Sequence, residues 1–447
     1  MIRAACALLA ALLLASPAPA RELWSSGEWT LELSGSVKEI ARATRGTDAA
    51  RFAEAAARDP RCAVSLTFAD CSAFAGVGDK SIWQSLTRAR VRLDLRKGKP
   101  FGAVLVYDNE LLFGTLDTLG AELGESLRTD SLADLEWDVR VLGMPTDHRR
   151  WRMRLYRAYL EGEVGKLEGR VGRQRVAWGV GRLWSPSDRF NFIPPLAIEQ
   201  DQNLGVDAVD LRWNFDGFTF LEAVYQAADD RDDDNFGLRF QGSAGELDYT
   251  LLAGRWTEAW AAGVNLAGNL GDAAFRMEAI YTDPTRDVWP VGTLSPRELD
   301  PFWQLLLSVD NNFPIGRGLY VLLEHLYNGN ALGFGGGEAG TLLPFFEARG
   351  LAVQPASAGI FGGSLVVTGA SHQTGLQLGY DVTSILRVDL LALYDWNGSS
   401  AVIAPILTYS PLGSVELTLG AQFFAGPRLS QYGPQDHQAY VMAEWFF

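Results

Sequence analysis

The sequence predicts an all-β fold, a single antiparallel transmembrane β-barrel of about 18 strands, with about 16 as the alternative count. Four observations lead to this class. Apolar and polar side chains alternate in segments of about ten residues, and short and long connections follow one another. No apolar run beyond residue 20 reaches the roughly 18 residues that a transmembrane helix needs. A chain of 447 residues would suggest about two or three soluble domains, but neither a linker nor a change of composition divides it.

Alternation is clearest between Leu86 and Arg96. One face of this segment carries Ala89, Val91, Leu93 and Leu95. The other face carries Arg88, Arg90, Arg92, Asp94 and Arg96. A period of two is that of a strand with one apolar and one charged face. In a soluble sandwich the apolar face would point into the protein, whereas in a membrane barrel it contacts lipid and the charged face lines a water-filled lumen.

The same alternation recurs to the end of the chain, for example in 209–215, 275–281, 386–394 and 415–423. Each segment has about ten residues, which suits a strand that crosses a bilayer at a tilt of about 45°. The predicted strands begin near residues 29, 86, 100, 150, 166, 206, 217, 235, 246, 259, 273, 302, 318, 372, 385, 401, 414 and 437.

The connections support this register independently. Short turns take every second connection, at 97–99, 216–217, 243–245, 381–384 and 411–413. Longer segments fall among the others, at 42–83, 108–149, 178–205, 283–301 and 329–371. Short periplasmic turns that alternate with long extracellular loops are typical of membrane barrels, and this arrangement places both termini in the periplasm.

The first 20 residues predict a cleavable signal peptide. Arg3 provides the basic start, residues 4–15 form an apolar stretch too short to span a bilayer, and an Ala-x-Ala site ends at Ala20. We therefore expect residues 21–447 to form a barrel in the outer membrane of a Gram-negative bacterium, in contact with lipid and lipopolysaccharide.

The last strand predicts a partner in assembly. Val441, Ala443, Trp445 and Phe447 form one apolar face that runs to the carboxyl terminus. A terminal aromatic residue after an amphipathic strand is similar to the signal that the outer-membrane barrel-insertion machinery reads. The alternative interpretation is a strand that closes a soluble sheet.

Composition excludes some functions and leaves others open. The formal charge of −15 argues against binding of nucleic acid by the whole chain. The 14 Trp, 13 Tyr, 23 Phe and 47 Gly, with 21% charged residues, are typical of a barrel with aromatic girdles, although a large soluble β-protein shares them.

Cysteine and histidine usage predicts neither a metal site nor an enzyme. Cys62 and Cys71 have no His or further Cys nearby, so we expect one disulfide rather than a zinc site. The four histidines show no spacing that supports a catalytic triad, and no cofactor is expected. The run 229–234 contains five aspartates, and the alternatives there are a divalent-cation site and a solvated acidic loop.

Arginines occupy many positions predicted to face the lumen. The candidates for the pore lining are Arg88, Arg90, Arg92, Arg152, Arg154, Arg173 and Arg175. Fixed guanidinium charge in a narrow aqueous pore raises the local concentration of anions and slows cations. The alternative is that these arginines pair with carboxylates and only stiffen the wall, with Asp94, Glu161, Glu163 and Glu168 as partners.

Alternation stops in the segment 172–191, which is rich in glycine, aromatic and charged residues. Glycines allow the backbone to fold back or to approach another segment closely. We expect this segment to enter the lumen as a constriction, with Trp178 and Trp184 as stacking surfaces and Arg182, Asp188 and Arg189 as charged contacts. The alternative is a structural plug packed against the barrel wall.

A resemblance to a known family rests on the same segment. A Gly172-Arg173-Gln174 strand end is followed by Trp178-Gly-x-Gly-Arg182 and by a Pro186-x-Asp188 loop. This pattern, with the strand 206–215 after it, resembles the porin-like barrels of proteobacteria grouped with alginate-export proteins. The resemblance implies an exporter or a passive diffusion channel for small solutes, and it transfers no substrate. A non-conducting structural or surface-polymer-binding barrel, plugged by its loops, is the alternative.

Overall fold

The computed structural model describes residues 21–45, 81–98, 100–114, 136–140, 148–191, 193, 195–199, 205–228, 234–256, 259–285, 300–329, 331, 370–427, 430–433 and 437–447. The predicted signal peptide, Cys62, Cys71 and residues 229–233 of the acidic run lie outside these ranges. Within them, no helix has both the length and the apolar character that crossing a membrane requires.

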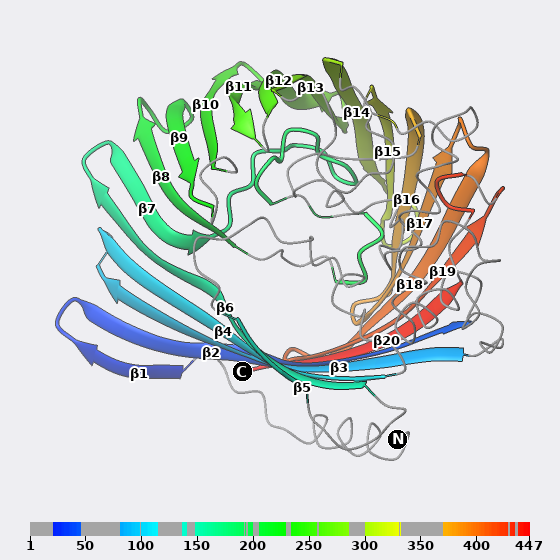
Figure 1. Ribbon diagram of the computed structural model, residues 1–447, viewed down its shortest axis with the longest axis horizontal. Helices are drawn as coiled ribbons and strands as arrows, with labels where there is room; N and C mark the ends of the chain where they lie inside the picture. The colour runs from blue at the N-terminus through cyan, green and yellow to red at the C-terminus, as the bar shows by residue number, and fades with distance from the viewer. Residues whose placement is uncertain are drawn as a thin grey trace.

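The described residues form one antiparallel sheet that closes on itself (Figure 1). Its wall has 18 strands, so the predicted fold class and strand number are confirmed. The wall strands are β2 (Trp29–Arg45), β3 (Ser81–Lys97), β4 (Phe101–Gly114), β6 (His148–Val164), β7 (Leu167–Gln174), β8 (Val206–Asn214), β9 (Phe220–Gln226), β10 (Asn235–Ala244), β11 (Leu247–Trp256), β12 (Ala259–Leu270), β13 (Ala273–Pro284), β14 (Phe302–Phe313), β15 (Leu319–Asn328), β16 (His372–Thr383), β17 (Leu386–Asp395), β18 (Ser400–Leu412), β19 (Val415–Ala425) and β20 (Gln438–Phe446).

Closure occurs between the first and last wall strands. β20 pairs with β2 along its length, and the amide of Phe447 donates to the carbonyl of Gly35 at 3.0 Å while Gly35 donates back at 2.9 Å. A β-carbon on Gly35 would stand 2.2 Å from the carbonyl oxygen of Arg90 and 2.7 Å from the Phe447 ring, so only glycine fits this seam.

Two further strands lie outside the continuous wall. β1 (Arg21–Ser26) pairs with the start of β2, and β5 (Glu136–Arg140) pairs with residues 150–154 of β6. The wall strands differ in height: β6 has 17 residues, whereas its neighbour β7 has 8. β7 therefore pairs only with residues 158–164 of β6, and β5 pairs with residues 150–154 on the same side of that strand. After Gln174 the chain leaves the wall and turns inward (Figure 1).

Every second connection is short, and these connections gather at one end of the barrel, which we call the short-turn rim. The other end, the long-loop rim, has the longer connections together with two short ones, 257–258 and 396–399. Positive-φ glycines make several of the tight turns at the short-turn rim, among them Gly98, Gly165, Gly245 and Gly271.

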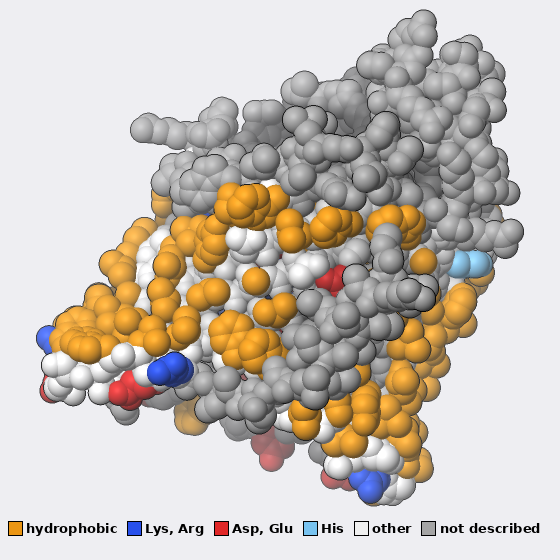
Figure 2. Space-filling model, turned by 90° about the horizontal axis from the view of Figure 1, so that it is seen from below, with side chains coloured by type: hydrophobic (Ala, Val, Ile, Leu, Met, Phe, Trp, Pro, Cys, Tyr) orange, Lys and Arg blue, Asp and Glu red, His pale blue; other side chains and the backbone are white. Residues whose placement is uncertain are grey.

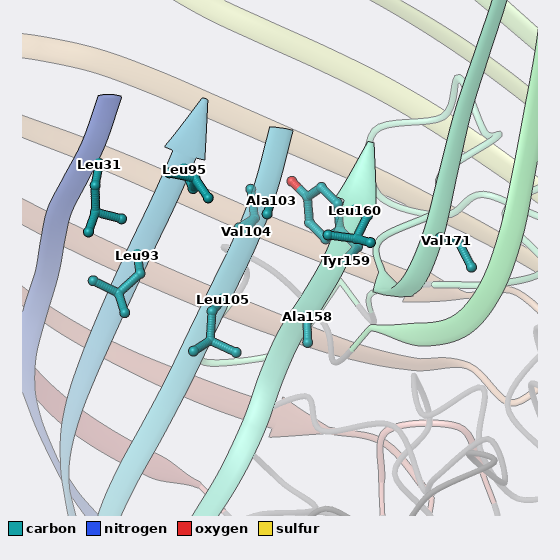
Figure 3. A pocket seen from close by; sticks show the side chains of 10 residues that line it. All are labelled: Leu31, Leu93, Leu95, Ala103, Val104, Leu105, Ala158, Tyr159, Leu160 and Val171. Carbon is teal, nitrogen blue, oxygen red and sulfur yellow. The ribbon is translucent and has the colours of Figure 1, made fainter. Parts of the chain in front are cut away.

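Outward-facing side chains are apolar and exposed (Figure 2). Leu251, Leu323 and Leu419 are each about half exposed, as are Trp260 and Trp303. A shallow apolar groove of about 380 Å³ runs over β2, β3, β4, β6 and β7 on this side (Figure 3). A closed barrel with this exterior satisfies its backbone hydrogen bonds internally and presents its apolar surface to hydrocarbon.

Candidate functional site

A cluster of arginines and carboxylates covers the lumen face of β3, β4 and β6. Because β4 lies between β3 and β6, the carboxylates of Asp108 and Glu110 stand between two rows of arginines. We call this group the basic patch: Arg88, Arg90, Arg152, Arg154, Asp108 and Glu110. Alternation alone brings these residues to one face, and antiparallel pairing sets them side by side.

Short ion pairs hold the basic patch together. Asp108 receives two hydrogen bonds from Arg90, each 2.7 Å long. Glu110 is fully buried and accepts from Arg88 at 2.5 Å, from Arg152 at 2.7 Å and from Arg154 at 2.9 Å. Buried charges of this kind are retained only when they are paired and hydrogen-bonded. Pairing therefore accounts for most of the predicted arginine ladder.

The partners differ in part from those predicted. Asp94 pairs with Arg92 at 2.8 Å, and Glu161 with Arg170 at 3.3 Å, as the pairing alternative expected. The principal partners, Asp108 and Glu110, were missed. The sequence contains little indication of them, because two carboxylates in an otherwise apolar segment can be identified as ion-pair partners only when the neighbouring strands are known.

A bulge in β6 adds a residue that the periodicity could not predict. The β4–β6 register shifts between Val106 and Tyr107, and Tyr156 and Arg157 are both buried beside this shift. The Tyr156 ring lies 3.7 Å from the guanidinium carbon of Arg90 and 4.3 Å from that of Arg157. Cation–π contacts thus link Arg157 to the basic patch.

Arg173 lies near the end of β7 and is 8% exposed. It pairs with Asp207 of β8 at 2.9 Å. The residue predicted to line the pore is thus a buried charge that is paired with a carboxylate. Gly172, with a φ of +120°, interrupts the regular strand between Arg170 and Arg173, so alternation alone does not assign the face of Arg173.

After β7 the chain enters the lumen (Figure 1). We call residues 175–199, as far as they are described, the inner segment. Gly179 and Gly181 permit its compact fold. A β-carbon on Gly179 would stand 1.5 Å from Ser185 Oγ, and one on Gly181 would stand 1.9 Å from the carbonyl oxygen of Trp184. Steric crowding thus explains why both of these positions in the Trp-Gly-x-Gly-Arg motif are glycine.

Two buried carboxylates of the wall anchor the inner segment. Glu278 of β13 accepts hydrogen bonds from the amides of Val180 and Gly181, both at 2.7 Å, and from the amide of Ser187 at 2.9 Å. The hydroxyl groups of Ser185 and Ser187 donate to it as well, at 3.0 and 2.6 Å.

Glu324 of β15 binds the turn between these contacts. It accepts from the amides of Arg182 at 2.9 Å, Leu183 at 3.0 Å and Trp184 at 2.7 Å. Glu278 and Glu324 are both fully buried, so backbone amides provide much of the compensation for their charge. Sequence reasoning missed both, because each is an isolated acidic residue on an ordinary amphipathic strand.

Apolar contacts reinforce this anchoring. Trp178 packs edge-on against Phe190 and Trp256, with ring centroids 5.1 and 5.9 Å apart. Trp184 belongs to a buried cluster with Leu306 and Leu322 of the wall. Trp178 and Trp184 are each only 2% exposed, so they anchor the inner segment and present no free stacking surface to a solute, contrary to the prediction.

The far end of the inner segment contacts the opposite wall. Glu199 pairs with Lys38 of β2 at 2.9 Å and with Arg88 of β3 at 2.5 Å. Burial alone would raise the pKa of Glu199, but Arg88 and Lys38 outweigh it and lower the pKa to about 2. The inner segment is therefore attached to β13 and β15 at one end and to the basic patch at the other.

The charged residues of the inner segment divide by exposure. Arg175 and Arg182 are exposed, whereas Asp188 and Arg189 are buried. One Nη of Arg189 donates to Thr282 at 2.9 Å and to Gln304 at 3.1 Å. Burial lowers the pKa of Arg189 to about 10. Of the predicted contacts, Arg182 remains available to a solute.

Acidification is expected to tighten the docking of the inner segment. Burial raises the pKa of Asp188 from 3.8 to about 6, with Glu278 adding to the effect and Arg175 opposing it. The neutral Asp188 carboxyl is thus favoured in the folded state. Its contribution to the stability of the docked inner segment is lost as the pH rises through about 6. The difference is worth about 3 kcal/mol at most.

Hydrogen exchange of the amides of residues 182–185 and of Ser187, corrected for intrinsic exchange, measures this effect. Protection should be greater at pH 5 than at pH 7.5. In Asp188→Asn the protection of these amides should depend less on pH. If the pH dependence of protection were unchanged, a group other than Asp188 would cause it.

No group of three or more His, Cys, Asp or Glu side chains that would hold a metal ion occurs among the described residues. His372 begins β16, and His325 lies next to Glu324 but on the opposite face of β15. Asp234, the described end of the acidic run, accepts from the amide of Ala228 at 2.8 Å.

Solved structures share the fold. OccAB1 of Acinetobacter baumannii is similar with a TM-score of 0.53 and 10% identity, covering 97% of this chain and 99% of its own. OccAB2 of the same species has a TM-score of 0.50 and 10% identity, covering 93% and 97%. The outer membrane protein OprD from Pseudomonas aeruginosa has a TM-score of 0.49 and 9% identity, covering 96% and 95%.

No protein-family model matches the chain, and no curated protein matches it either. At these identities the structural likeness concerns the fold alone. Together with the apolar exterior, the closed wall of 18 strands identifies the fold as a transmembrane β-barrel, the fold that these solved structures share.

Proposed function

We propose that this protein is a passive diffusion channel for small anionic solutes, narrowed by the inner segment. The observation that carries the proposal is the attachment of the inner segment to both sides of the lumen. A segment held at both ends narrows an aqueous lumen without moving in it, and transport then depends on the width and charge of the remaining passage.

The distribution of charge supports the preference for anions. The carboxylates that hold the inner segment are engaged by amides and by cations, whereas Arg175 and Arg182 are exposed on the same segment. Arg92 adds a guanidinium that is 41% exposed. Exposed fixed positive charge in a confined aqueous passage concentrates anions.

Planar-bilayer recordings of the refolded protein test the proposal. Stable conductance steps with a reversal potential that favours anions are expected. In Arg175→Gln/Arg182→Gln the reversal potential should move toward zero selectivity, because two positive charges leave the passage. The matched control is Lys166→Gln/Arg317→Gln, which removes two exposed positive charges from turns at the short-turn rim. Equal shifts in both variants would contradict a selectivity role for the inner segment.

A plugged barrel that conducts nothing is the second candidate. It is favoured by the large buried side chains of the inner segment, since Trp178, Trp184 and Arg189 are each at most 2% exposed. A structural or polymer-binding barrel would give no steps in the wild type. It would give steps only after the inner segment is released.

The proposed setting also includes features of export and assembly. Residues 1–20 would be removed as a signal peptide, the short-turn rim would face the periplasm, and the strand ending at Phe447 would be read by the insertion machinery. Lipopolysaccharide would surround the long-loop rim. The Gly172–Asp188 motif supports membership of the alginate-export-like group as part of this proposal.

A further inference from the structure

Two histidines face outward near the long-loop rim. His325 is opposite Thr374 in the β15–β16 register, and His372 is opposite Tyr327. Alternation places His325 on the face of Leu323, which is 53% exposed, and opposite to the fully buried Glu324. The two imidazoles are therefore diagonal neighbours on the exterior of the wall and lie outside the lumen.

Aromatic residues surround this pair. The His372 ring lies 5.1 Å from that of Tyr327, and Tyr394 contacts Trp396 with centroids 5.0 Å apart. Tyr and Trp mark the level of the lipid headgroups on membrane barrels. His372 is itself exposed. An ion can therefore reach this level from water.

The separation of the two ring nitrogens matches a metal site. His325 Nε2 and His372 Nδ1 are 3.3 Å apart, which is at the long limit for a hydrogen bond between nitrogens. Two imidazole nitrogens at about 2.0–2.1 Å from one tetrahedral metal ion stand about 3.3 Å from each other. The metal would replace the proton that the two nitrogens otherwise share.

A second layer of hydrogen bonds orients His325. Its Nδ1 lies 2.9 Å from Thr374 Oγ1, and the indole N–H of Trp396 donates to the same oxygen at 2.8 Å. When Nδ1 of His325 donates to Thr374, the lone pair of Nε2 points to His372. Metal-binding histidines commonly donate their other ring N–H to an oxygen in this way.

We propose that His325 and His372 bind a divalent transition-metal ion, of which Cu²⁺, Ni²⁺ and Zn²⁺ suit imidazole ligands best. No third His, Cys, Asp or Glu joins them within the part of the chain that the structure describes, so water completes the coordination there. The site is open, lies on the exterior, and is independent of the proposed transport.

Calorimetric titration of the full, tag-free protein in detergent with Ni²⁺ and with Zn²⁺ tests the proposal. One ion per chain is expected. His325→Gln and His372→Gln should each weaken binding at least tenfold, whereas the control His148→Gln should bind as the wild type does. Thr374→Val keeps both ligands and removes only the orienting oxygen, so a loss of about tenfold is expected. Circular dichroism verifies that every variant retains its strands.

Copper adds a spectroscopic readout. Electron paramagnetic resonance of bound Cu²⁺ should show two coupled nitrogens in the wild type and one in each histidine variant. Undiminished binding in both histidine variants would overturn the proposal, as would a wild type that binds no metal at millimolar concentration.

Discussion

Replacing Glu278 and Glu324 together by alanine is expected to release the inner segment and to raise single-channel conductance several-fold. The two carboxylates accept hydrogen bonds from six amides between Val180 and Ser187. Hydrogen bonds to charged groups contribute about 1.5–3 kcal/mol each, and buried amides left without an acceptor add a further cost. The docked position should therefore lose its advantage, and the passage should widen.

Proteolysis measures the same release without relying on conductance. Arg189 is 1% exposed, so trypsin should not cut after it in the wild type and should do so in the double variant. Asp389→Asn is the control, because Asp389 pairs with Arg387 at 2.8 Å on β17 and forms no contact with the inner segment that we describe. Glu278→Gln/Glu324→Gln keeps one acceptor oxygen at each position, so its conductance and its rate of cleavage by trypsin should lie between those of the wild type and the alanine variant. If the alanine variant kept both the wild-type conductance and the wild-type resistance to trypsin, the aromatic contacts alone would anchor the inner segment.

Glu110→Gln is expected to lower barrel stability by about 3–5 kcal/mol and to strengthen the preference for anions. Glu110 is fully buried and pairs with Arg88, Arg152 and Arg154. The substitution conserves shape but removes the negative charge, so buried guanidinium charge is less compensated. The same change adds one positive charge to the lumen, which attracts anions. Urea unfolding in lipid vesicles gives the stability, and reversal potentials in a KCl gradient give the selectivity.

Asp94→Asn is the matched control for Glu110→Gln. Asp94 also lies between arginines, but Arg92 and Arg96 are 41 and 42% exposed. Exposed ion pairs contribute about 0–1 kcal/mol, so the loss of stability should be small. Equal losses in the two variants would mean that burial does not decide the contribution of these carboxylates.

Strand positions followed closely from the amino-acid pattern. The predicted starts near 206, 235, 259, 273, 302 and 372 coincide with those of β8, β10, β12, β13, β14 and β16. They are accurate because the period of two is a property of each segment alone, imposed by lipid on one side and water on the other. Where a local irregularity interrupts the period, as at Tyr156 and Arg157, prediction of the lumen face ends.

The candidate site was only partly predictable. The sequence indicated that 172–191 leaves the wall and that Arg88, Arg90, Arg152 and Arg154 share the lumen face. It did not indicate that Trp178 would be covered by Trp256 or that Arg173 would pair with Asp207. These outcomes depend on which segments become neighbours when the barrel closes.

By itself the sequence determined the barrel, its strand number and the segment that enters the lumen, because alternation, turn length and glycine content are local properties of the chain. Only the tertiary structure decided where that segment attaches and which charges remain exposed. Glu278 and Glu324 act on residues more than 90 positions away, and Glu199 reaches Arg88 from 111 positions away. Such contacts follow from closing the sheet, which brings opposite walls within reach of one inner segment.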